Sequence, residues 1–137
     1  MKYDEFLKLH PIGGGLNTKK RKDDEEHRIQ CACVRWFRYE YPEYMCLLYA
    51  VPNGGRRDRV SGAKLKAEGV LAGVSDLNMD VPNSRYHGLR IEMKTGNGRQ
   101  QESQKEYQQA VEKAGYKYVV CRSVDEFMGV VREYLGS

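Results

Sequence analysis

Three charged residues within residues 73–94 have the types needed for metal-assisted hydrolysis: Asp76, Glu92 and Lys94. Carboxylate oxygens hold hard divalent cations, and a lysine beside them can steady an attacking water. We therefore predict that the rest of the chain is organised around this stretch. The alternative is an ordinary solvated strand face with a Glu–Lys pair, because such spacing also arises by chance.

The pattern around these acids indicates two strands arranged as a hairpin. Within residues 89–94 apolar and charged side chains alternate strictly, which is the period of a half-buried strand. The apolar side chains are predicted to face the core, whereas Glu92 and Lys94 emerge together on the opposite face. Asp76 belongs to the other strand, and residues 81–88 form a turn-rich link. The two acids can therefore converge.

The other segments predict a single α/β domain with a central mixed β-sheet flanked by helices. Helices are expected at residues 23–41, 61–69, 100–114 and 123–135, with further strands at 45–51 and 116–121. Gly69 and Gly115 are expected to end two of these helices. The continuous apolar run at 45–51 predicts a buried strand. Residues 1–22, which contain Pro11 and three consecutive glycines, are expected to be a flexible lead-in to a domain at 23–137.

Composition limits the class of protein. A chain of 137 residues can bury one hydrophobic core without needing disulfides or structural metals. It has no apolar run near the roughly twenty residues that span a bilayer, and acids occupy the place of a signal peptide's apolar segment. We therefore expect a cytoplasmic protein without a membrane partner. The four cysteines have no zinc-binding spacing and are expected to be core thiols.

The net charge of +4 is modest, but basic residues cluster along the chain. Such clusters suit contacts with a nucleic-acid backbone, although a charge run is more often a solvated surface. A turn at residues 53–57 adds glycines that allow close approach of a ligand, or forms an ordinary Asn-Gly turn. The candidate DNA-binding residues are Asn53, Arg56, Arg57, Lys64 and Arg99.

Several motifs occur together in a recognisable order. They are Glu26 with Gln30, residues 52–55, 69–76 and 91–94, Ser103–Gln104, and Gly115 through Val120. Together they resemble the VRR-NUC (virus-type replication-repair nuclease) family of the PD-(D/E)xK phosphodiesterases, over residues 23–135. The resemblance is to the stand-alone phage and bacterial members, which implies the cytoplasm of a bacterial or phage-infected cell. The resemblance implies a restriction-endonuclease-like core and a nuclease domain at 23–137. Ser75 stands where the superfamily has proline; proline there only restrains the backbone, so the ligand chemistry is unchanged.

The resemblance also implies a metal site. Asp76 and Glu92 would be ligands, with the backbone carbonyl of Met93, and Glu26 would join them directly or through water. The cofactor would be Mg²⁺, which keeps several waters, and Mn²⁺ should substitute because it prefers similar oxygen ligands.

Two further residues receive roles from the resemblance. Lys94 would orient the nucleophilic water or stabilise charge on the phosphorane, and Gln104 would position that lysine or contact the substrate. The activity implied is Mg²⁺-dependent hydrolysis of DNA phosphodiester bonds, with catalytic residues Glu26, Asp76, Glu92, Lys94 and Gln104.

The substrate and the partners are open to more than one interpretation. Stand-alone members of the family resemble homodimeric nucleases that cut branched DNA such as Holliday junctions, in replication, repair or recombination. The alternative is a monomeric flap-processing or end-processing nuclease that works with a helicase. Two other classes are a non-catalytic DNA-binding module and an enzyme that forms a Schiff base through Lys94.

Overall fold

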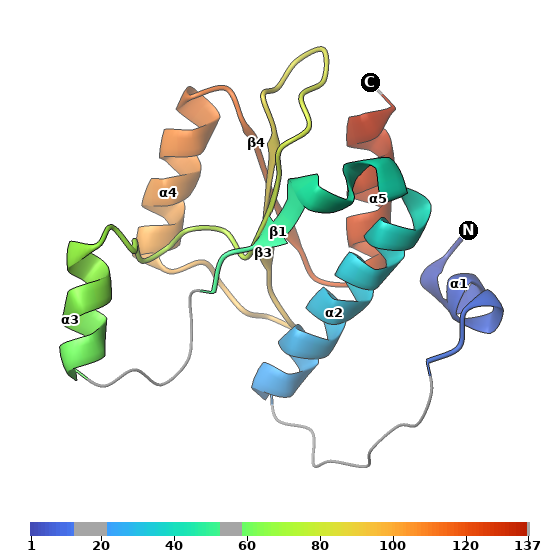
Figure 1. The fold of residues 1–137 in the computed structure, drawn as a ribbon, viewed down its shortest axis with the longest axis horizontal. Coiled ribbons are helices and arrows are strands. Elements are labelled where there is room, and N and C mark those ends of the chain that lie inside the picture. The colour runs from blue at the N-terminus through green and yellow to red at the C-terminus, as the bar shows by residue number, and fades with distance from the viewer. Residues whose placement is uncertain (13–21, 53–58, 137) are drawn as a thin grey trace.

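The computed structural model describes residues 1–12, 22–52 and 59–136, and its centre is a four-stranded mixed sheet (Figure 1). The strands are β1 (Leu48–Ala50), β2 (Leu77–Met79), β3 (Leu89–Met93) and β4 (Lys117–Cys121), in that order across the sheet. The first two pairings are antiparallel, and β3 pairs with β4 in parallel. The predicted hairpin is therefore β2 with β3.

Helices cover both faces of this sheet. They are α1 (Tyr3–Leu9), α2 (Lys22–Glu40), the 3₁₀ helix η1 (Pro42–Leu47), α3 (Arg59–Ala67), α4 (Glu102–Lys113) and α5 (Val124–Leu135). Figure 1 shows α3 and α4 on one side of the strands and α2 and α5 on the other. The α/β architecture predicted from the sequence is confirmed.

The main core lies between the sheet and helices α2 and α5. The strict alternation in β3 sends Leu89 and Ile91 into this core, where both are fully buried. From the helices come Trp36 and Phe127, whose rings meet edge to face at 5.9 Å. Burying side chains of this size contributes most of the free energy that stabilises a domain.

The opposite face of the sheet is covered by α4 and is polar. Its buried side chains include Asn78 and Glu92, which are 8% and 3% exposed. Helix α4 contributes no fully buried residue of its own. This face is therefore sealed by hydrogen-bonding side chains rather than by apolar packing.

Two glycines end helices in the way the sequence predicts. Gly69 and Gly115 have φ values of 103° and 97°, which suit glycine. At Gly69 the amide of Val70 reaches Leu65 O and the amide of Gly69 reaches Lys66 O. Gly115 ends α4 with the same pair of bonds, so both are Schellman caps.

The strand expected at residues 45–51 is wrong in extent and burial. Residues 42–47 form η1, with Pro42 at its first turn, and β1 keeps three residues. Leu48 is buried, but Tyr49 is 42% exposed. The reason is position: β1 is the outer strand of the sheet, so only part of its apolar surface meets other elements.

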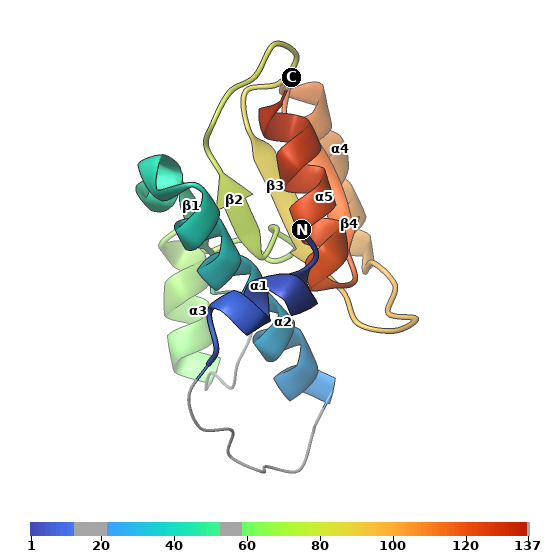
Figure 2. The ribbon, with the colours of Figure 1, turned by 90° about the vertical axis from the view of Figure 1, so that its right-hand side faces the viewer.

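The N-terminal segment also differs from the expected flexible lead-in. Residues 3–9 form α1, which lies across α2 near α5 (Figure 2). Phe6 is only 2% exposed, and the Arg35 guanidinium lies over its ring at 5.8 Å. Burial of one aromatic ring anchors this short helix; residues 13–21 lie outside the described part of the chain.

The burial of the cysteines and the character of the helices can be compared with the expectations from the sequence. Cys33 and Cys121 are buried as expected, whereas Cys31 and Cys46 are exposed. Burial raises the pKa of Cys121 to about 12, so this thiol stays protonated. Among the described helices, none is long and apolar enough to cross a membrane.

Candidate active site

Asp76 lies at the start of β2, where the hairpin turns its side chain toward β3. Its carboxylate accepts a hydrogen bond of 2.7 Å from the backbone N–H of Met93. Its own carbonyl accepts one from Val51 N–H at 3.0 Å. These bonds fix Asp76 between two neighbouring strands, so its position depends on the sheet and not on a loop.

Glu92 projects from the middle of β3 onto the polar face. Its Oε1 accepts a hydrogen bond of 2.9 Å from the Gln104 side chain and lies 3.8 Å from the Lys94 ammonium. Its Oε2 is buried and has no hydrogen-bond partner. A buried carboxylate oxygen without a partner is costly, and it commonly marks a place where an ion or water binds.

The surroundings of Glu92 act strongly on its ionisation. Burial, followed by the negative charge of Asp76, raises the pKa of Glu92 to about 8, and the charge of Glu26 acts in the same direction. The Lys94 ammonium lowers it, but less than burial and Asp76 raise it. The acids therefore repel one another, and a bound cation would relieve that repulsion.

Gln104 holds Glu92 through a side chain that is itself fixed at both ends. Its Oε1 accepts from the backbone N–H of Gln101 at 2.8 Å, which caps the first turn of α4. Its Nε2 donates to Glu92. Because the oxygen is occupied by a backbone donor, the amide must present its NH₂ group to the carboxylate.

Lys94 follows directly after β3, and its backbone N–H continues the parallel ladder to Cys121 O at 3.0 Å. The next residues turn sharply, with Gly98 N–H bonded to Thr95 O and Gly96 at a φ of 50°. This turn brings Gly98 against the aliphatic stem of Lys94. The ammonium is thereby directed toward Glu92.

The candidate residues meet in one small cleft of about 230 Å³. Glu26 reaches it from α2, and its Oε1 lies 3.5 Å from the Thr95 hydroxyl. The lining is Glu26, Ala72, Gly73, Val74, Asp76, Glu92, Lys94 and Gln104. All five predicted catalytic side chains thus border the same space.

The donor set of the cleft fits a hard divalent cation. Asp76 and Glu92 supply carboxylate oxygens, one of which is buried and accepts no hydrogen bond. Met93 is not among the residues that border the cleft, so the role of its carbonyl as a ligand stays a prediction. Within the described residues no three acidic, histidine or cysteine side chains converge closely enough to form a complete ligand group. Glu26 is therefore best placed to act through water, a manner that Mg²⁺ favours because it retains waters.

Of the predicted DNA-binding residues that the structure describes, neither Lys64 nor Arg99 borders this cleft. Asn53, Arg56 and Arg57 lie outside the described residues. Lys64 is exposed on α3, and Arg99 is exposed just after the turn that follows Lys94. Their assignment stays a prediction.

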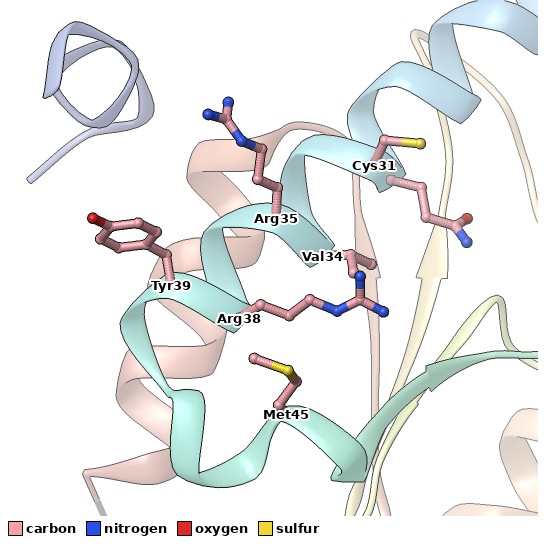
Figure 3. Close-up of a pocket in the computed structure, with 7 residues that line it drawn as sticks. Cys31, Val34, Arg35, Arg38, Tyr39 and Met45 are labelled. Carbon is pink, nitrogen blue, oxygen red and sulfur yellow. The ribbon is translucent and has the colours of Figure 1, made fainter. Parts of the chain in front are cut away.

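Gln30, which the motif pairs with Glu26, lines a different hollow between α2 and η1 (Figure 3). That hollow is larger, about 530 Å³, and it is bordered by Val34, Arg38 and Met45. It offers cations and apolar groups but no acid, so it cannot hold a divalent metal. The smaller cleft is the better candidate on chemical grounds.

Several residues that support the site were not identified from the sequence. The Ser75 hydroxyl, fully buried, donates to Asn78 at 2.7 Å and lies 3.4 Å from the Tyr107 hydroxyl, which ties α4 to the strand that begins at Asp76. Proline at position 75 could not make these bonds. Thr95 and Tyr118, which accepts from Gln100, are also buried nearby. The sequence signal that could have identified such residues is the presence of polar side chains at positions of α4 and β4 where the periodicity predicts core residues.

Comparison with known proteins gives a consistent result. The model of the VRR-NUC domain matches residues 24–125. A solved structure described as a VRR_NUC domain protein is similar, with a TM-score of 0.72 and 29% sequence identity, over 87% of this chain and 92% of that one. No curated protein matches the chain significantly.

Proposed function

The chain belongs to the VRR-NUC family of nuclease domains, and on that premise we propose that it hydrolyses DNA phosphodiester bonds with a divalent cation bound between Asp76 and Glu92. The observation that carries the proposal is that a buried Glu92 carboxylate, whose Oε2 accepts no hydrogen bond, lies beside the carboxylate of Asp76 and a lysine. Burial and the charge of Asp76 raise the pKa of Glu92, so the ionised pair is unfavourable without a cation. With one, they form an oxygen site for Mg²⁺ or Mn²⁺.

The metal would be held by the carboxylates of Asp76 and Glu92 and the carbonyl of Met93, with Glu26 acting through water. When bound, Mg²⁺ lowers the pKa of a coordinated water and offsets charge on the phosphate. The chain's own part is to keep these oxygens fixed. The hydrogen bond from Met93 N–H does so for Asp76, and the Gln104 amide does so for Glu92.

Lys94 is the residue we assign to the reacting phosphate. Its ammonium borders the cleft 3.8 Å from Glu92 and can orient the attacking water or stabilise charge that develops on the phosphoryl oxygens. The turn packed on its stem limits the directions that the side chain can take. Gln104 acts by holding Glu92 and is therefore a positioning residue.

For the substrate, we propose branched DNA such as Holliday junctions, cut by a homodimer. One chain provides one cleft, so symmetric cuts in two strands of a junction require two copies. A small polar cleft that holds one lysine suits contact with the backbone and shape of DNA rather than with base sequence. The alternative is a monomer that trims flaps or ends beside a helicase, and a mass of one chain in gel filtration would favour it.

The experiment is cleavage of labelled four-way junction, flap, linear duplex and single-stranded DNA with Mg²⁺, Mn²⁺ or a chelator. The variants are Asp76→Asn and Lys94→Met, with Asp80→Asn as the matched control. Asp80 follows the same strand but is exposed and pairs with Arg90 at 2.9 Å, an ion pair of small energetic weight. We expect metal-dependent cutting that survives Asp80→Asn and is lost in the other two variants.

Each outcome has a definite meaning. Paired nicks in the junction support the homodimeric resolvase, and cutting limited to flaps or ends supports the alternative with the same site. Salt-sensitive DNA binding without cleavage in the presence of any metal would contradict the proposed enzymatic activity and indicate a non-catalytic DNA-binding module. An unchanged rate in Asp76→Asn would place the site elsewhere.

A further inference from the structure

A second hollow adjoins the candidate cleft on its outer side. It has a volume of about 640 Å³ and lies between α3 and α4. Leu65 and Lys66 of α3, Val70 and Leu71 of the following link, and Ser103 and Glu106 of α4 border it. Ala72 borders both this hollow and the cleft, so the two spaces are adjacent.

The wall between the two spaces is thin because of one glycine. A Cβ at Gly73 would clash with the Ser103 carbonyl oxygen, and the φ of Gly73, 88°, suits glycine. The link therefore passes directly over the first turn of α4, where Ser103 faces the hollow and Gln104 faces the cleft.

The link exposes two adjacent apolar side chains at that point. Val70 is 40% exposed and Leu71 is 61% exposed, while the other exposed large apolar residues described lie on or beside α1, α2, η1 and β1. The Schellman cap of α3 explains why Val70 is apolar. The residue that follows the glycine in this motif commonly contacts a side chain in the last turn of the helix, which here is Leu65. The cap does not account for Leu71, which no turn or core requires to be apolar.

We propose that Leu71 is a contact for an unstacked base next to the cleaved phosphate, which makes the enzyme selective for DNA in which base stacking is interrupted. This inference rests on the function proposed above. In a continuous duplex the apolar faces of the bases are hidden in the stack, so an exposed leucine beside the cleft has nothing to pack against. At a branch, flap or single strand a base face is free, and apolar side chains are used to receive or separate such bases.

The charges of the hollow agree with a nucleotide as occupant. Lys66 on the α3 wall can pair with a phosphate, whereas Glu106 on the α4 wall disfavours one there. A strand would therefore run with its backbone toward α3 and its base toward Val70 and Leu71. Ser103 offers a hydroxyl that can accept from or donate to a base edge.

The test compares Leu71→Ser with Leu9→Ser. Leu9 is 63% exposed on α1, so both variants remove an equally exposed leucine from the surface. Cleavage is measured on a matched pair of substrates, a duplex and the same duplex with a flap or junction. Binding is measured separately in an Asp76→Asn background, with 2-aminopurine placed beside the expected cleavage site as a fluorescent reporter of unstacking.

We expect Leu71→Ser to lower kcat/KM on the branched substrate about tenfold, the low end of what a base contact contributes, with little change on duplex. The 2-aminopurine signal should fall in the same variant, and Leu9→Ser should match the parent in both assays. Equal behaviour of the two leucine variants, with the parent cutting normally, would overturn this inference and keep the proposed function.

Two other results can be told apart from that one. If the parent cuts no substrate with any metal, the proposed function fails and the inference fails with it. If Leu71→Ser changes the mass in gel filtration and not the fluorescence, the surface binds a second copy of the chain, and the base contact is overturned.

Discussion

The two faces of the sheet are built on opposite principles. On the face toward α2 and α5, side chains such as Trp36, Ile91 and Phe127 are fully buried and apolar. On the face toward α4, the buried groups include Ser75, Asn78 and Glu92, which depend on hydrogen bonds. Strands β2 and β3 supply both faces by simple alternation.

The difference indicates a division of labour within a very small domain. The apolar face supplies most of the stability, since its burial is the dominant favourable term. The polar face keeps acids in proximity and a buried oxygen without a partner, which costs stability. Chemistry and folding can therefore be disturbed separately, by substitutions on opposite sides of one strand.

The largest effect should come from Glu92→Gln on the polar face. We expect cleavage to fall by at least about 1,000-fold, because a metal ligand and several kcal/mol of charge stabilisation are lost. Thermal stability in a chelator at pH 8 should be unchanged or higher, since the amide can still accept from Gln104 and removes a buried charge beside Asp76. Cleavage rates and thermal unfolding of the same samples test the expected loss of activity and the expected stability. A lower unfolding temperature for Glu92→Gln would contradict the separation of chemistry and folding between the two faces.

The converse substitution is Phe127→Ala on the apolar face. It should lower the free energy of unfolding by about 3–5 kcal/mol, because the ring is fully buried against Trp36. Urea denaturation measures this loss. Molecules that remain folded at low temperature should cut DNA at close to the normal rate, and Phe127→Leu should lose less stability. A large activity loss in the folded fraction would contradict the separation of the two faces.

Stability should also depend on pH through Glu92 on the polar face. The pKa of Glu92 rises to about 8 in the folded chain from an ordinary 4.5. The folded state thus holds a proton that the unfolded state releases, so this stabilisation is complete below pH 4.5 and is lost as the pH rises through 8. In a chelator, the unfolding free energy of the parent should decline by a few kcal/mol across that window relative to Glu92→Gln. Parallel curves for the two proteins would refute the assignment.

A smaller effect is expected for Gln104→Ala, which leaves every proposed ligand in place. Loss of its hydrogen bond should free Glu92 and reduce cleavage by about 10–100-fold, the usual range for a group that holds a metal ligand. Metal affinity, measured by titration of Mn²⁺, should weaken with it. Gln109→Ala, at an exposed position of the same helix, serves as control and should stay within about twofold of the parent.

Much of this arrangement could be predicted from the sequence. The alternation in residues 89–94 identified β3, and glycines at 69 and 115 identified two helix ends, because both depend on local geometry. The convergence of Asp76 with Glu92 followed from the hairpin. Alternation reveals which side chains share a face, but it does not reveal what covers that face. The burial of Glu92 under α4 therefore could not be predicted.

Other features depended on contacts between distant segments. Helix α1 is held by Phe6 against residues of α2. A segment of seven residues is too short to form a stable helix by itself, so its docking could not be predicted from its sequence. The Ser75 hydroxyl gains its role from Tyr107, 32 positions away. Residues 45–47 were expected in a strand because apolar content alone does not distinguish a strand from a 3₁₀ turn.

The double use of the Gln104 side chain also makes the state of the cleft observable from the backbone. The amide proton of Gln101 is bonded to the same side chain that holds Glu92. Hydrogen exchange at Gln101 therefore reports local opening of the first turn of α4 together with release of the carboxylate. A divalent cation that fixes Glu92 should slow this exchange, whereas exchange at Phe127, on the other side of the sheet, should follow global unfolding only.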